Sequence, residues 1–174
     1  MIGPNLLLRA PEPDDIDIIF RWENDMNIWH LSNTLAPFSR FAIEQFVLNT
    51  DNDIFTSKQL RLMIDCHSSV AGTATVGSID LFDFDPHNQR AGIGILIDEP
   101  SRRKGFASEA LSLLVEYCFN TLNLHQLYCN IGQNNTESIS LFTKAGFILC
   151  GHKKEWVLRE GSWTDELMFQ LINK

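Results

Sequence analysis

Residues 91–119 constrain the fold of this chain more than any other segment. They open with apolar and glycine residues at positions 91–97, a run that is typical of a buried strand. They close with apolar residues spaced three and four apart, which is the pattern of one helix face: Ala107, Ala110, Leu111, Leu114, Val115, Cys118 and Phe119. The sequence therefore predicts a strand, a short turn and an amphipathic helix in direct succession.

The turn between this strand and helix is cationic. Arg102, Arg103 and Lys104 precede Gly105, in a chain whose net charge is −8. A helix start presents unpaired N–H groups and the positive end of the helix dipole, and glycine lets a ligand approach the backbone closely. These properties favour a phosphate-binding turn. The alternative is a charged surface turn that only caps the helix.

Two common phosphate motifs do not fit this turn. A P-loop needs a lysine after its second glycine, whereas Lys104 precedes Gly105. A dinucleotide fingerprint would start at Gly92 and Gly94, but its third glycine is missing. The pattern Arg102-x-x-Gly105-x-Ala107 does fit, because it resembles the coenzyme A pyrophosphate loop of the GCN5-related N-acetyltransferases, the GNAT superfamily.

The remaining pattern predicts one mixed α+β domain over residues 1–174. Strands are expected at 6–10, 59–65, 75–84, 89–97, 127–131, 147–158 and 163–172, with a turn at 66–72. Helices are expected from Pro13 to Asn24, after an N-cap at Ser39, and after Asn135. The strand at 59–65 alternates apolar and polar residues, which predicts that one of its faces is exposed. A helical crossover makes strands 89–97 and 127–131 parallel.

A second motif supports the resemblance. Residues 135–147 resemble the acetyltransferase signature N-x-x-S/A-x-x-L-Y-x-x-x-G-F at every position but Phe142. The C-terminal turn with Gly161 and Asp165 is similar to the spermidine and ribosomal-protein N-acetyltransferase branch. The resemblance implies a GNAT-like α/β fold. Its central sheet is mixed and mostly antiparallel, contains a splayed parallel strand pair, and is flanked by helices.

The resemblance also implies acetyl-CoA as cofactor, bound between the splayed strands. The residues that it assigns to cofactor binding are Ile95, Leu96, Ile97, Arg102, Arg103, Lys104, Gly105, Phe106, Ala107, Ser108, Asn130, Asn135 and Phe142. Unpaired strand amides would take up the pantetheine arm like an added strand. Asn135 has a second interpretation as a helix N-cap, and both roles can hold at once.

Two catalytic side chains that the family often uses are absent. Gly92 stands where a glutamate often removes the amine proton, and Phe142 stands where a tyrosine protonates the leaving thiolate. A base is needed because a primary amine with a pKa of ~10.4 is almost fully protonated at neutral pH. Asp80 is the predicted substitute and Asp83 is second to it, although both also fit solvated carboxylates at a strand end. A thiol of pKa ~8.5 is a good leaving group, which makes the missing tyrosine tolerable.

The acceptor pocket is expected from residues 22–38 and the last hairpin. Aromatic and acidic side chains suit an alkylammonium ion, and the candidates are Trp22, Glu23, Trp29, His30, Phe38, Glu155 and Trp156. The predicted activity is acetyl transfer to a primary amine by direct attack in a ternary complex. The acceptor is a polyamine such as spermidine or a protein N-terminal α-amine. The alternative is a non-catalytic acyl-CoA-binding sensor or regulatory module.

Composition excludes several other classes. The acidic balance argues against nucleic-acid binding, and no apolar run approaches the ~20 residues of a membrane helix. The first five residues lack the pattern of a signal peptide, so a cytoplasmic enzyme is expected. Neither the four cysteines nor the five histidines have metal-ligand spacing, so no metal is expected. A homo-oligomer stays possible.

Overall fold

The computed structural model describes residues 1–29, 34–48, 53–68, 72–159 and 161–174. The chain forms two compact units, one made of Met1–Arg9 and Asp53–Lys174 and the other of Ala10–Asn52. The single domain expected for residues 1–174 stays a prediction. Among the described residues, no helix is both long and apolar enough to cross a membrane.

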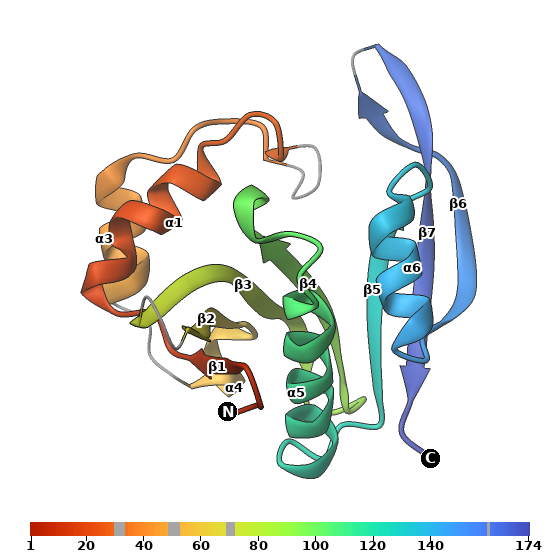
Figure 1. The fold of residues 1–174 in the computed structure, drawn as a ribbon. Helices are drawn as coiled ribbons and strands as arrows, with labels where there is room; N and C mark the ends of the chain where they lie inside the picture. Colours follow the sequence, from red (N-terminus) through yellow and green to blue (C-terminus); the bar gives the residue numbers. More distant parts are fainter. Residues whose placement is uncertain (30–33, 49–52, 69–71, 160) are drawn as a thin grey trace. The chain divides into compact units, whose positions relative to one another are not determined.

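A sheet forms the centre of the larger unit (Figure 1). In the described chain it has seven strands in the order β1-β2-β3-β4-β5-β7-β6, and only β4 and β5 pair in parallel. The strands are β1 (Leu6–Arg9), β2 (Leu60–Ser68), β3 (Gly72–Asp85), β4 (Arg90–Ile97), β5 (Gln126–Gly132), β6 (Ile148–Arg159) and β7 (Ser162–Ile172). The predicted mixed, mostly antiparallel sheet is therefore confirmed.

The parallel pair is hydrogen-bonded at one end and open at the other. Its register joins Arg90 to Gln126, Ala91 to Leu127 and Gly92 to Tyr128, and then it stops. Beyond that point β4 continues along β3 and β5 continues along β7, so the two strands diverge (Figure 1). The splayed pair is thus present. We call the end at Gly92 and Tyr128 the closed end, and the end at Ile97 and Gly132 the open end.

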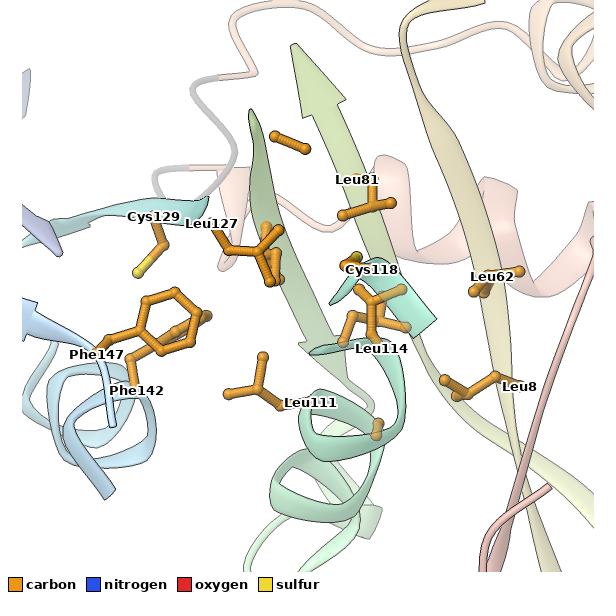
Figure 2. Close-up of a cluster of buried hydrophobic side chains, with 14 of the residues drawn as sticks. Leu8, Leu62, Leu81, Leu111, Leu114, Cys118, Leu127, Cys129, Phe142 and Phe147 are labelled. Carbon is orange, nitrogen blue, oxygen red and sulfur yellow. The ribbon is translucent and has the colours of Figure 1, made fainter. Parts of the chain in front are cut away.

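The described part of the larger unit has four helical elements, of which the last two were predicted from the sequence. They are the short α4 (Ile54–Ser57), the 3-10 turn η2 (Glu99–Ser101), α5 (Phe106–Asn120) and α6 (Thr136–Lys144). The inner face of α5 is completely buried at Ala110, Leu111, Leu114 and Cys118. Figure 2 shows this face beside Leu81 and Leu127 of the sheet. The apolar spacing that predicted the helix is therefore the spacing that fills the core.

The structure corrects two predictions about β2. The strand was expected to have one exposed face and to end before Cys66, but it runs to Ser68 and buries both Met63 and Asp65. Asp65 is tolerated inside because Arg9 Nε donates to its Oδ2 at 2.6 Å and Thr75 Oγ1 donates to its Oδ1 at 2.8 Å. A buried, paired carboxylate and a solvent-exposed one give the same alternation of apolar and polar residues along a strand. The sequence therefore could not tell a buried face from an exposed one.

The smaller unit contains the 3-10 turn η1 (Pro13–Asp15), α1 (Ile16–Glu23) and α3 (Arg40–Leu48). As predicted, α1 ends at the C-cap Asn24, and Ser39 begins α3 by accepting a hydrogen bond from the amide of Ala42 at 3.0 Å. The short α4 of the larger unit was not predicted. Asp53 caps it by accepting from the amide of Phe55 at 3.0 Å.

Candidate active site

At the open end, a turn follows the last residue of β4 and leads into the start of α5. Gly105 is the N-cap of α5, and its φ of +86° lies in the left-handed region that favours glycine. A Cβ built at Gly105 would meet nothing within 4 Å, so space lies in front of the helix. The left-handed backbone therefore explains the glycine, and the open space leaves room for a ligand in front of the helix.

The first backbone amides of α5 have neither a helical carbonyl nor a capping side chain as hydrogen-bond acceptor in the described chain. The first hydrogen bond of the helix runs from the amide of Glu109 to the carbonyl of Gly105 at 3.2 Å, and in the described chain no side chain caps this end. The amides of Phe106, Ala107 and Ser108 thus have no helical carbonyl to bind. Unpaired amides at the positive end of a helix 15 residues long suit an anion. This geometry fits the pyrophosphate of acetyl-CoA.

The three cations of the turn have different contacts. Arg102 Nε donates to the carbonyl of Ile97 at 3.1 Å, which fastens the turn to the last residue of β4. Arg103 pairs with Glu137 of α6 at 3.0 Å, which joins the two sides of the open end. Lys104 is exposed and has no ion pair with any described residue. Lys104 is accordingly the cation that is free to meet a phosphate.

The walls of the splay come from β4 and β5. Ile95, Leu96 and Ile97 are half-buried and pair with β3 on one side only. Their edge toward β5 has no ladder partner in the described chain, so an extended ligand with amide groups could pair there. On β5, the Oδ1 atom of Asn130 accepts from Lys153 Nζ at 3.0 Å. These positions leave the pantetheine interpretation intact as a prediction.

Asn135 and Phe142 both have structural roles. The Oδ1 atom of Asn135 accepts from the amide of Ser138 at 3.1 Å, which confirms the N-cap interpretation. Phe142 is only 3% exposed and packs edge-to-face on Phe147, with ring centroids 5.1 Å apart. Figure 2 shows both rings pointing into the core near Cys129. Cofactor contacts by Asn135 or Phe142 stay predictions.

The two candidate bases lie in contrasting surroundings. Asp80 is held by the guanidinium of Arg61, with Nε at 2.9 Å from Oδ1 and Nη2 at 3.1 Å from Oδ2. Both oxygens of Asp80 are therefore already occupied by a cation. Asp83 instead accepts a single hydrogen bond, from the hydroxyl of Tyr128 at 3.0 Å. Burial, then the hydrogen bond to Asp83, raises the pKa of Tyr128 to about 12, so its hydroxyl stays a donor.

Tyr128 is a residue of this site that the sequence did not single out. It stands on β5 opposite Gly92, at the last pair before the strands diverge. The sequence predicted that these two strands are parallel, but only their register in the structure places residue 128 at the level of the missing glutamate.

The hairpin of β6 and β7 carries the other acceptor candidates of the larger unit. Asp165 binds His152 Nε2 at 2.6 Å, Lys154 Nζ at 2.9 Å and the amide of Glu155 at 2.9 Å. The bond to Lys154, followed by that to the Glu155 amide, holds the pKa of Asp165 well below its usual range. Glu155 lies in a bulge with φ of +48°, and Trp156 is exposed with Lys153 Nζ 5.1 Å from its ring centre. This network fixes the bulge that presents Glu155 and Trp156.

The remaining candidates belong to the smaller unit. Trp29 donates from Nε1 to the carbonyl of Glu23 at 2.8 Å, Phe38 is exposed and Trp22 is buried. His30 lies outside the described residues. A pocket shared by these residues and the hairpin stays a prediction. Within the described chain, no cluster of three or more His, Cys, Asp or Glu side chains could hold a metal ion.

Comparison with known proteins identifies the class. A family model for the acetyltransferase (GNAT) domain matches residues 5–148. The chain belongs to this family, and it is an N-acetyltransferase that uses acetyl-CoA.

Several relatives match over almost their whole length. An uncharacterized N-acetyltransferase p20 of Bacillus licheniformis is 28% identical over 172 residues, covering 97% of this chain and 93% of the relative. A spermidine N(1)-acetyltransferase of Vibrio cholerae is 26% identical over 167 residues, covering 94% and 91%. The crystal structure of a Vibrio cholerae spermidine N-acetyltransferase in complex with CoA and spermine has the same fold, with a TM-score of 0.86 and 22% identity over 98% of this chain and 96% of that one.

Proposed function

We propose that residues 1–174 act as one enzyme that transfers the acetyl group of acetyl-CoA to a primary amine of a small polycation such as spermidine. The observation that carries the proposal is the splay between β4 and β5, which leads into the uncapped start of α5. An anion site at one end of an unpaired strand edge matches a ligand with a pyrophosphate and an amide-containing arm.

The donor half of the site would use the backbone more than side chains. The amides of Phe106, Ala107 and Ser108 would bind the pyrophosphate, and Lys104 would add an unpaired positive charge. The free edge of residues 95–97 would align the arm. Bound in this way, acetyl-CoA supplies a thioester whose carbonyl carbon an amine can attack.

The acceptor half is supported by charge and by relatives. The chain has a net charge of −8, which attracts a polycation through its summed field. Relatives over most of the chain are spermidine N(1)-acetyltransferases from Vibrio cholerae and Escherichia coli. A protein N-terminal α-amine is the other acceptor that the C-terminal turn favours.

A non-catalytic acyl-CoA-binding module has one observation in its favour. Gly92 and Phe142 remove the two usual catalytic side chains, and Arg61 occupies both oxygens of the predicted base Asp80. Such a module would bind CoA without turnover.

One assay separates these functions. Thiol release from acetyl-CoA is measured with spermidine, spermine, a short peptide with a free N-terminus and an uncharged amine. We expect release with the polyamines, and an acceptor KM that rises with ionic strength because salt screens the attraction. CoA binding without amine-stimulated release would instead establish the module, and faster release with the peptide would establish the α-amine.

A further inference from the structure

At the closed end of the splay, three paired residues lie side by side across β3, β4 and β5, and the middle one has no side chain. Phe82 of β3 pairs with Gly92 of β4, and Gly92 pairs with Tyr128 of β5. The Phe82 ring fills the space over Gly92, since a Cβ there would lie 2.2 Å from its Cε2 atom. The ring also packs edge-to-face on Tyr128, with centroids 5.8 Å apart. The absent side chain at Gly92 thus lets side chains of β3 and β5 meet across β4.

Asp83 lies next to Phe82 on β3 and also reaches Tyr128. The β3–β4 register shifts between Phe82 and Asp85, and Asp83 adopts a left-handed φ of +50° in that irregularity. Its carboxylate receives the Tyr128 hydroxyl at 3.0 Å. A carboxylate from β3 is therefore fixed to β5 beside the position at which the family often has a glutamate on β4. Asp83 is exposed, and the hydrogen bond that it accepts comes from a neutral hydroxyl rather than from a cation.

In the proposed binding mode, the reactive end of acetyl-CoA would approach this carboxylate. The anion site at Gly105 lies past the open end, because its turn follows the last residue of β4. An arm that starts there and lies in the splay runs back toward Gly92 and Tyr128. Its thioester end would then lie toward the closed end, where Tyr128 holds Asp83.

We propose that Asp83 accepts a proton from the attacking amine and returns it to the departing sulfur, and that Tyr128 is the positioning residue that holds Asp83. The substrate ammonium first loses one proton to solvent. The resulting neutral amine forms the new C–N bond with its lone pair and gives a second N–H proton to Asp83. The C–S bond breaks, its electron pair goes to sulfur, and Asp83 passes the same proton to the thiolate. The products are the acetamide and the free thiol.

One carboxylate suffices for both transfers. The nitrogen and the sulfur share one carbon during the reaction, so both come within reach of the same oxygen atoms. Return of the proton is favourable, because a thiol has a pKa of ~8.5 and a carboxyl group one of ~3.9. Asp83 would thereby replace both the glutamate absent at Gly92 and the tyrosine absent at Phe142. This inference rests on the proposed acetyl transfer to an amine.

The first test compares aspartates of β3. Asp83→Asn is expected to lower kcat by about 10²–10⁴-fold with acceptor KM and CoA affinity within twofold of wild type. Asp80→Asn should lower kcat less than this. Asp85→Asn removes the same charge two residues away, where Asp85 accepts from Asn88 in the β3–β4 turn, and serves as the matched control. A kcat of Asp83→Asn within threefold of wild type, or a change in KM alone, overturns the proposal.

Two further variants separate a catalytic role of Asp83 from an effect on folding. Asp83→Ala should regain turnover with added formate, a small carboxylate that enters the vacated space, whereas Asp85→Ala should not respond. Tyr128→Phe should lower kcat about tenfold at an unchanged melting temperature, because it frees Asp83 without removing it. Failure of formate rescue overturns the catalytic role of Asp83. A wild-type protein that acetylates no amine overturns the proposed function instead.

Discussion

The open and closed ends of the splay present different kinds of groups. At the open end the backbone dominates, through a left-handed glycine and the uncapped amides of α5. At the closed end side chains dominate, through the Asp83–Tyr128 hydrogen bond and the Asp80–Arg61 pair. A pyrophosphate is common to every acyl-CoA reaction, and a fixed backbone suits it. The chemistry of proton transfer depends on particular side chains, which can be replaced from a neighbouring strand.

The largest expected effect is the loss of CoA affinity when the open end is disrupted. Gly105→Asp places a carboxylate where a Cβ now meets open space, in front of the helix amides. Loss of a charge-assisted phosphate contact costs about 1.5–3 kcal/mol, and repulsion adds to this. Calorimetry should therefore show CoA affinity lowered by at least about tenfold.

Gly161→Asp is the control for that substitution. Gly161 also has a positive φ, of +79°, and open space at its Cβ, but it lies in the β6–β7 turn. Both variants carry the same strain and the same charge, so only the position differs. Equal CoA affinity in the two variants would contradict the assignment of the turn at Gly105.

Phe142 tests whether the closed end can regain the family's usual acid. Because its ring is 3% exposed and packed on Phe147, a hydroxyl at this position would enter the core. An unsatisfied buried hydroxyl costs about 1–3 kcal/mol. We expect Phe142→Tyr to lower the free energy of unfolding by that amount in urea titrations and to raise kcat by less than tenfold. A several-hundredfold rise would mean that the natural chain is catalytically impaired and would favour the regulatory module.

The contrast between the two ends also explains which features could be predicted from the sequence and which could not. Backbone features have local signals, so Gly105, the face of α5 and the Asn135 cap were correctly predicted from spacing and residue type. The parallel direction of β4 and β5 followed from the helix between them. The burial of Asp65 and the pairing of Asp83 with Tyr128 depend on contacts between distant residues, which no local pattern records.

The cations of the open end allow a finer comparison. Lys104 has no ion pair in the described chain, whereas Arg103 is already paired with Glu137. We expect Lys104→Gln to weaken CoA binding about fivefold at low salt and Arg103→Gln to weaken it less, since an exposed charge contributes up to about 1 kcal/mol. The difference should shrink in titrations at high salt. A larger loss for Arg103→Gln would assign the phosphate contact to the arginine.

The smallest expected effect concerns Glu109, which lies in the first turn of α5 and binds the start of β1. Glu109 accepts from the amides of Asn5 and Leu6, at 2.8 and 3.1 Å, and from Asn5 Nδ2 at 2.9 Å. Burial opposes the charged form, but these hydrogen bonds outweigh it and lower the pKa of Glu109. The charged glutamate therefore stabilises the fold above the ordinary glutamate pKa of about 4.3, and this contribution is lost as pH falls through the lower folded pKa.

Glu109→Gln should accordingly melt at a lower temperature than wild type at pH 7, and the gap should narrow below about pH 4. Glu116→Gln is the control, because Glu116 is an exposed glutamate of the same helix and forms no ion pair with any described residue. Melting curves from pH 3 to 7 measure both variants. CoA affinity of Glu109→Gln at pH 7 should stay within twofold of wild type, since the carboxylate binds β1 and leaves the amides before it to the ligand. A pH-independent gap would show that packing, rather than the charge of Glu109, joins α5 to β1.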